Sequence, residues 1–379
     1  PEFTGMPNLE YLDLEGCSYL EEVHHSLGCC KKLIRLNLSF CSRLIRFPCV
    51  NVESLKYLSV GECSRLEKFP EIHGRMKPEI QIHMKRSGIR ELPSSVFQYQ
   101  THITELDLRS MDNLVALPSS ICRLKSLVSL NVSGCSKLER FPDEMGDLDN
   151  LEVLDARHTL ISRPPSSIVR LNKLKILMFG GFKDGVHFEF PPVAEGLRSL
   201  EYLDLTCCNL IDGGLPEDIG FLSSLKELNL SGNNFEHLPR SIAQLGALRI
   251  LDLTICKRLT QLPELPPELD TIYVDWSNDL ICNSLFQNIS SLQHDISASD
   301  SLSLRAFTSK DRYDDMRSWF HHRGRDRSVS VDLPENWYIP HKFLGFAVCY
   351  SGRLIDTTTQ LIPVCDDGMS WMTRKLALS

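Results

Sequence analysis

A short apolar motif recurs along most of the chain and constrains the fold more than any other feature. Residues 9–17 read LEYLDLEGC, residues 127–135 read LVSLNVSGC and residues 225–233 read LKELNLSGN, so each is LxxLxLxx followed by Cys or Asn. Segments of this kind begin at Leu9, Leu33, Leu55, Glu79, Ile103, Leu127, Leu151, Leu174, Leu200, Leu225, Leu248 and Leu269. Successive starts lie 21 to 26 residues apart, which is the spacing of a structural repeat.

This pattern predicts an α/β repeat solenoid of the leucine-rich-repeat type. The leucines alternate with other residues along a short strand, so they would face the core while the intervening residues face solvent. No repeat can bury its apolar side alone, and the strands should therefore stack into one parallel sheet on the concave side of a horseshoe. The position after each strand is filled by Cys17, Cys41, Cys63, Cys135, Cys208, Cys256, Thr159 or Asn233. We expect these side chains to bond to backbone groups of the adjacent repeat.

The return segments contain proline and predict an irregular or 3-10 convex side. Residues 114–121 read LVALPSSI, and a comparable proline follows at Pro93, Pro142, Pro216, Pro239 and Pro263. Proline lacks an amide donor and fixes φ, which suits short turns better than long helices. Two repeats depart from the pattern: the fourth begins with Glu79, and in the eighth residues 180–192 predict a protruding loop.

The pattern ends after Leu269, and we expect three regions. Residues 1–276 would form an N-terminally truncated repeat domain of about twelve repeats, and the polar, Ser-rich residues 277–318 would form a connector. Residues 328–333 and 343–350 read as β-strands, so residues 319–379 predict an all-β, jelly-roll-like domain. About 100 residues are usual for a β-sandwich, so we expect this one to be partial.

Composition and motifs exclude several function classes. The net charge of −8 and the pI near 5.9 argue against nucleic acid as a partner. The sequence contains no apolar run long enough for a membrane span. It also lacks a phosphate-binding GxxxxGK[ST] loop, a GxGxxG motif and an HExxH motif. We therefore expect no catalytic residue, no cofactor and no metal site in this chain.

The 14 cysteines follow the repeat rather than a metal or disulfide framework. No CxxC pair occurs, which argues against structural zinc. We expect reduced thiols, with Cys17, Cys41, Cys63, Cys135 and Cys256 buried between repeats.

Several segments resemble plant intracellular immune receptors that combine a Toll-like (TIR) domain, a nucleotide-binding domain and leucine-rich repeats. The resemblance is carried by the LxxLxLxGC repeats, by the LPSS returns at residues 92–95 and 117–120, and by residues 331–338 (VDLPENWY) followed by residues 343–348 (FLGFAV). It implies a sensing and autoinhibitory module that recognises a viral protein or another pathogen effector, directly or through a host protein. It also implies contacts with the receptor's own TIR and nucleotide-binding domains, whose NAD-hydrolysing and ADP/ATP-switching chemistry lies outside this chain.

The same resemblance implies a cytoplasmic location, with the nucleus as a second compartment, and oligomers only of the activated full-length receptor. The alternative is a secreted or cell-surface binding ectodomain. Asn37, Asn131, Asn229 and Asn288 fit the glycosylation pattern. However, three of these four matches lie within the repeat motif, in which Asn, an apolar residue and Ser follow one another, so the motif itself produces most of them.

Candidate partner-binding residues should lie where the repeats differ. Between the two central leucines the residue is mostly Asp or Asn, which we interpret as a solvated scaffold column. The two positions after each strand vary, and a basic cluster there contains Lys85, Arg86, Arg109 and Arg157. The cluster has two interpretations: pairing with the Asp column, or docking of an acidic protein surface. With His158, Phe40 and Ile255, these residues are the candidate partner-binding positions.

Overall fold

The computed structural model describes residues 2–274 except 49, 71, 74–76, 78–79, 98–101, 182–186 and 195. Beyond them it describes residues 280–281 and 284 and the strands β15 (Arg305–Phe307), β16 (Thr358–Leu361) and β17 (Arg374–Ala377). Pro1–Ser309 and Lys310–Ser379 form separate compact units. In the second unit β16 pairs with β17 antiparallel. The strands expected at residues 328–333 and 343–350 lie outside the described residues.

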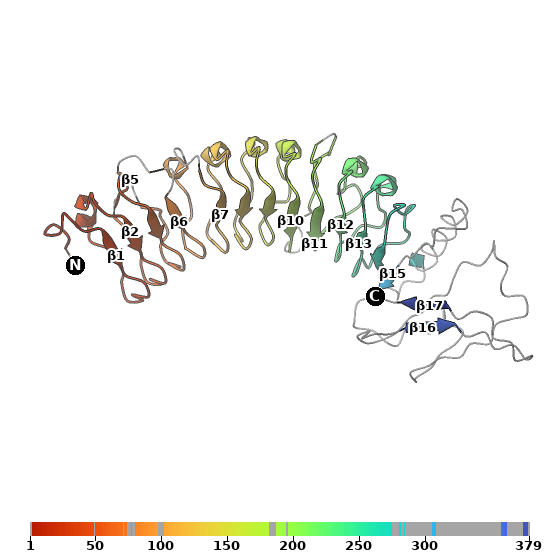
Figure 1. Ribbon diagram of the computed structural model, residues 1–379, viewed down its shortest axis with the longest axis horizontal. Helices are drawn as coiled ribbons and strands as arrows, with labels where there is room; N and C mark the ends of the chain where they lie inside the picture. The colour runs from red at the N-terminus through yellow and green to blue at the C-terminus, as the bar shows by residue number, and fades with distance from the viewer. Residues whose placement is uncertain are drawn as a thin grey trace, which may run out of the picture. The chain divides into compact units, whose positions relative to one another are not determined.

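Each predicted repeat contributes one short strand, and the strands stack side by side along the first unit (Figure 1). Every strand begins two residues after the predicted repeat start, so the register is confirmed. The strands are β1 (Tyr11–Asp13), β2 (Arg35–Asn37), β4 (Tyr57–Ser59), β6 (Gln81–His83), β7 (Glu105–Asp107), β8 (Ser129–Asn131), β9 (Val153–Asp155), β10 (Ile176–Gly180), β11 (Tyr202–Thr206), β12 (Glu227–Asn229), β13 (Ile250–Asp252) and β14 (Thr271–Tyr273). All pairings among them are parallel, which confirms the solenoid fold.

The strands form two sheets rather than one. One sheet has the order β1-β2-β4-β6, and the other runs from β7 through β14 to β15, which lies in the predicted connector. Although β6 and β7 are not paired, the array continues across this break, because the Arg86 amide donates to the Arg109 carbonyl at 2.8 Å. A small second ladder joins β3 (Val50–Asn51) to β5 (Ile72–His73).

The core consists of the leucines of successive strands. Leu36, Leu130, Leu154 and Leu177 are each 0% exposed. Burying one such side chain contributes about 2 kcal/mol, so stability accumulates repeat by repeat.

The column after the strand ties neighbouring repeats together, as predicted. The thiols of Cys41, Cys63 and Cys135 lie 3.2, 3.0 and 3.1 Å from carbonyl oxygens of the preceding repeat. The Asn233 amide donates to the Leu205 carbonyl at 2.9 Å. The expectation for Cys17 was wrong: it belongs to the first described repeat and is exposed.

Short 3-10 turns form the opposite side of the repeats, as the prolines predicted (Figure 1). In the described residues they are η1 (His25–Cys29), η2 (Ser94–Val96), η3 (Ser119–Arg123), η4 (Met145–Asp147), η5 (Ser166–Arg170), η6 (Ile219–Phe221) and η7 (Arg240–Gln244). A proline precedes η2, η3, η5 and η7, where its fixed φ of −56° to −70° leads into the turn. Across the described residues, no helix has the length and apolar character that a membrane crossing needs.

The eighth repeat does not protrude throughout residues 180–192. Phe188 and Phe190 are 0% and 4% exposed, and the Phe188 ring packs 5.0 Å from that of Phe179. Their amides also donate to the carbonyls of Cys208 and Gly214 in the next repeat. The aromatic residues therefore anchor this part of the segment in the core, while residues 182–186 lie outside the described residues.

Candidate functional site

The Asp/Asn column between the central leucines is a set of backbone caps. In eight repeats its carboxylate or amide oxygen accepts the amide of the residue two positions later, at 2.9 to 3.2 Å. Such Asx turns satisfy the amide that leaves the strand. Asn37, Asp155 and Asp204 are only 2%, 4% and 7% exposed, so the column is less solvated than predicted. It is scaffold, as interpreted.

Much of the basic cluster is paired within the chain. Arg109 donates from Nε and Nη2 to the Asp107 carboxylate at 2.9 and 2.7 Å, and Arg157 does the same to Asp155 at 3.0 and 2.8 Å. The carboxylates raise the pKa of both guanidinium groups, first through these hydrogen bonds. Arg86 pairs with Glu62 at 3.2 Å. Of the two interpretations, pairing with the Asp column therefore describes Arg109 and Arg157 in this structure, whereas Arg86 pairs with Glu62 of the preceding repeat.

In eleven described repeats, the residue four positions after the central apolar residue of the strand forms a rim in which the backbone is left-handed. Four of these rim residues are glycines, namely Gly16, Gly134, Gly181 and Gly232, with φ from 69° to 76°. The others are Phe40, Glu62, Arg86, Ser110, His158, Cys207 and Ile255, with φ from 51° to 63°. Phe40 and Ile255 are 52% and 53% exposed. The His158 ring lies over Gly181, where a Cβ atom would meet its Nδ1 at 2.0 Å. The rim is therefore a row of outward side chains on a constrained backbone.

An aromatic and cationic cluster lies on the first sheet, at positions that the sequence interpretation did not consider. The Arg35 guanidinium carbon lies 3.8 Å from the centre of the Tyr57 ring, within cation–π range. The Tyr57 ring lies 5.1 Å from the ring of His83. Partial desolvation lowers the pKa of His83, and the charges of Lys85 and Arg35 lower it further, against the opposing effect of Asp107. The signal that could have identified this cluster is the residue before the central leucine, which reads Tyr11, Arg35 and Tyr57 in the first three repeats.

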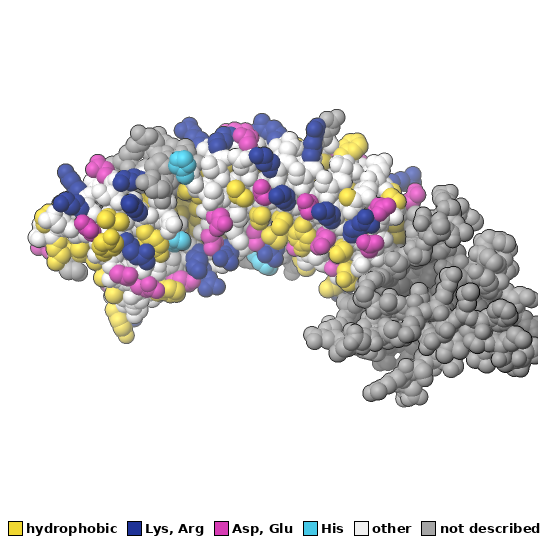
Figure 2. Space-filling model, in the orientation of Figure 1, with side chains coloured by type: hydrophobic (Ala, Val, Ile, Leu, Met, Phe, Trp, Pro, Cys, Tyr) yellow, Lys and Arg dark blue, Asp and Glu magenta, His cyan; other side chains and the backbone are white. Residues whose placement is uncertain are grey.

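On the second sheet, charges along the strand edge are internally balanced. Lys175 pairs with Glu152 and Lys226 with Glu201, each at 2.7 Å, and Arg249 pairs with Glu268 at 2.8 Å. Figure 2 shows acidic and basic side chains interspersed over the visible face of the repeats. This edge therefore presents no field of a single sign.

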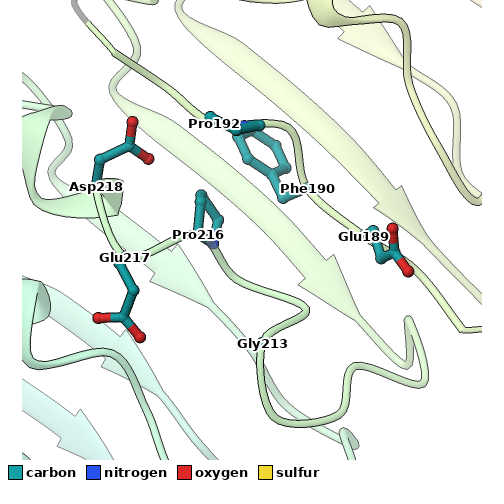
Figure 3. Close-up of a pocket in the computed structure, with 7 residues that line it drawn as sticks. All are labelled: Glu189, Phe190, Pro192, Gly213, Pro216, Glu217 and Asp218. Carbon is teal, nitrogen blue, oxygen red and sulfur yellow. The ribbon is translucent and has the colours of Figure 1, made fainter.

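A shallow hollow of about 450 Å³ lies beside the eighth and ninth repeats (Figure 3). It is lined by Glu189, Phe190, Pro192, Gly213, Pro216, Glu217 and Asp218. The Asp218 carboxylate accepts the amides of Val193 and Ala194 at 3.0 and 2.7 Å, and Glu189 pairs with Arg163. Two of its three carboxylates thus already stabilise the scaffold.

Among the described residues, one group has the spacing of a metal site: Asp212, Glu236 and His237. Asp212 accepts the backbone amides of Glu236 and His237 at 2.6 and 3.0 Å, and it lies 3.1 Å from His237 Nδ1. Glu236 pairs with Arg258. These contacts account for the cluster as a loop cap.

The buried thiols are poorly suited to nucleophilic chemistry. Burial raises the pKa of Cys63, Cys135 and Cys256 to about 12 and that of Cys122 to about 11. The thiolate is the nucleophilic form, and it is suppressed at neutral pH in these positions.

Comparison with known proteins assigns modules to three parts of the chain. Residues 316–376 match the C-JID domain family, residues 51–160 match the leucine-rich repeats described as disease resistance protein RPS4B-like, and residues 198–257 match a general leucine-rich-repeat family. These are recognition modules and not catalytic ones.

Two relatives match nearly the whole chain. TMV resistance protein N from Nicotiana glutinosa is 69% identical over 100% of this chain, and disease resistance-like protein DSC1 from Arabidopsis thaliana is 33% identical over 90% of it. The chain spans about a third of these relatives, namely 36% and 31% of their lengths. Among solved structures, the leucine-rich repeat domain of the type III effector XopL is 19% identical, with a TM-score of 0.39 over 69% of this chain and 74% of that domain. The chain belongs to the plant disease-resistance receptors of the TIR-type nucleotide-binding leucine-rich-repeat family, and its matched parts are the repeats and the C-JID module.

Proposed function

We propose that this chain is the recognition module of a plant disease-resistance receptor and binds a viral protein or another pathogen effector, directly or through a host protein. The observation that carries the proposal is the identity of 69% to TMV resistance protein N across the whole chain. The architecture is compatible with it, because a uniform set of Asx turns supports rows of side chains that differ from repeat to repeat. Such rows allow one scaffold to accept different partners.

The partner would contact the rim and the adjoining position, at Lys85, Arg86, Arg109, Arg157, His158, Phe40 and Ile255. An arginine that is stacked or bidentate within the chain keeps donors for a second acceptor, so internal pairing and binding are compatible. In the resting receptor the same surface would hold the receptor's own nucleotide-binding and TIR domains inactive. Effector binding would then favour the active oligomer through its differential affinity for the two states.

We also propose the division into a repeat domain (1–276), a connector (277–318) and a post-repeat β domain (319–379), supported by the C-JID match at residues 316–376. The receptor would act in the cytoplasm and in the nucleus. A secreted ectodomain is the less favoured function. Asn37 is 2% exposed and its side-chain nitrogen donates to Glu15 at 2.8 Å, so a glycan there would displace a formed contact.

Capture from infected plant tissue with the 379-residue chain as bait tests the proposal. We expect one pathogen protein, or one host protein together with it, to be retained from infected and not from uninfected tissue. An Arg109→Gln/Arg157→Gln chain is the internal comparison, because it changes the position that adjoins the rim and leaves the leucine core intact. Retention of no pathogen-dependent protein, together with an occupied glycan at Asn131 or Asn229 of the natural protein, would contradict the recognition role inside the cell.

A further inference from the structure

Most cations on the strand faces of the described repeats already have a carboxylate partner. Arg86, Arg109, Arg157, Lys175, Lys226 and Arg249 each lie within 4.0 Å of one. Within that part of the chain, Arg35, Lys56 and Lys85 form no ion pair, and all three belong to the first sheet. On the described strand segments of this chain of net charge −8, the cations without an ion pair therefore lie in repeats two to four.

Two of these cations flank one aromatic ring system. The Arg35 guanidinium carbon lies over the Tyr57 ring, 3.8 Å from its centre, and the Tyr57 ring lies 5.1 Å from that of His83. A guanidinium carries five N–H donors, so one that lies over a ring can still donate to a planar carboxylate. Tyr and Arg side chains held in this way are also the residue types that most often dominate protein interfaces.

Lys85 completes the cluster at the other end of the strands. It is exposed, and its stem lies over Gly61, where an added Cβ would be 3.9 Å from the Lys85 Cγ. Its neighbour Asp107 is already engaged by Arg109 through two hydrogen bonds. His83 carries little positive charge at neutral pH because its pKa is lowered, so the cluster's charge comes from Arg35 and Lys85.

We propose that Arg35, Tyr57 and Lys85 form a subsite for an acidic, extended segment of the partner protein. This subsite rests on the recognition role proposed above and assigns it a chemistry. From Arg35 to Lys85 the path crosses two strand spacings of about 4.8 Å and four residues of about 3.3 Å, a diagonal of roughly 16 Å. An extended peptide covers that distance in about five residues, so two carboxylates of one short segment can reach both cations.

Fluorescence anisotropy with a fluorescein-labelled hexaglutamate peptide tests the subsite directly on the 379-residue chain. Arg35→Gln/Lys85→Gln should weaken binding at least tenfold at about 50 mM salt, because two charge-assisted contacts are lost. The matched control, Lys175→Gln/Lys226→Gln, removes the same two charges from paired positions and should change binding less than twofold. Arg35→Lys keeps the charge without the planar fork and should show an intermediate loss.

Equal losses in the two double variants would overturn the subsite, since binding would then follow net charge alone. Tighter binding of an oligothymidylate of similar charge would overturn it as well, in favour of a nucleic-acid ligand. An Arg35→Gln/Lys85→Gln chain that still captures the pathogen-dependent protein as well as the unmodified chain would also reject the subsite while the recognition role stands. Unchanged urea midpoints establish that each variant is folded.

Discussion

Arg109 and Arg157 make nearly the same contacts in differently buried surroundings, so comparing them measures how much burial changes the contribution of an ion pair to stability. Arg109 and Arg157 each donate two hydrogen bonds to the Asp two residues earlier, at 2.7 to 3.0 Å. The side chain of Asp107 is 40% exposed, whereas that of Asp155 is 5% exposed. Water can therefore replace Arg109 at its carboxylate but cannot readily replace Arg157. Truncating the two arginines should have different costs.

We expect Arg109→Ala to lower the free energy of unfolding by no more than about 0.5 kcal/mol, as for exposed pairs. Removing the partner of a fully buried charge costs about 3–5 kcal/mol. Arg157 itself is 44% exposed, and Asp155 keeps its bond to the Arg157 amide at 3.2 Å, so about 2 kcal/mol is expected for Arg157→Ala. Equilibrium urea unfolding measures both changes, and about 1 M salt should remove the Arg109 effect while leaving most of the other. Equal losses for the two variants, or a loss at Arg157 that disappears in salt, would refute the argument.

Four further predictions follow from the repeat architecture. The Leu130 side chain is 0% exposed, so Leu130→Asp should lower the free energy of unfolding by about 5 kcal/mol or more. Ser129 lies on the outer side of the same strand, and Ser129→Asp should lower it by under about 1 kcal/mol. Similar urea midpoints for the two variants would disprove the register. Native alkylation at pH 8, read by mass spectrometry, should modify Cys17, Cys29 and Cys207 and spare Cys63, Cys135 and Cys256. Burial raises the pKa of the last three from 9.0 to about 12, so their stabilising contribution is complete below pH 9 and is lost as pH rises toward 12, which urea midpoints across that range would show. Ile255→Gly should leave the urea midpoint unchanged or raise it while reducing partner capture, and unchanged capture would remove Ile255 from the binding surface.

The sequence was sufficient to predict the register of the repeats. All twelve repeat strands begin where the leucine period placed them, because that period identifies which side chains are buried in the core. The 3-10 turns followed from proline in the same way. Both can be read from residue types within a single repeat, although the strands themselves form by pairing with the neighbouring repeats.

The features that sequence reasoning missed depend on contacts between repeats. A long side chain such as Arg157 can face solvent or fold back on Asp155, and periodicity does not distinguish the two. The stack of Arg35 on Tyr57 joins two strands 22 residues apart in sequence. The sheet break between β6 and β7 coincides with the repeat that begins with Glu79, a departure that the sequence showed without indicating its consequence.

At the rim, the backbone conformation is the same from repeat to repeat while the identity of the side chain varies. Each of the eleven rim residues adopts positive φ, eight of them directly after an Asx turn, and in ten repeats the rim amide donates to a carbonyl of the next repeat. The backbone there is therefore specified by hydrogen bonds that do not depend on the rim side chain.

Glycine would be the least strained residue at the rim, and four repeats use it. A left-handed conformation costs other residues roughly 1–2 kcal/mol, and a β-branched residue such as Ile255 is the least suited to it. A half-exposed Ile255 or Phe40 recovers little of that cost by packing. Because packing does not account for these two side chains, we propose that they contact a partner.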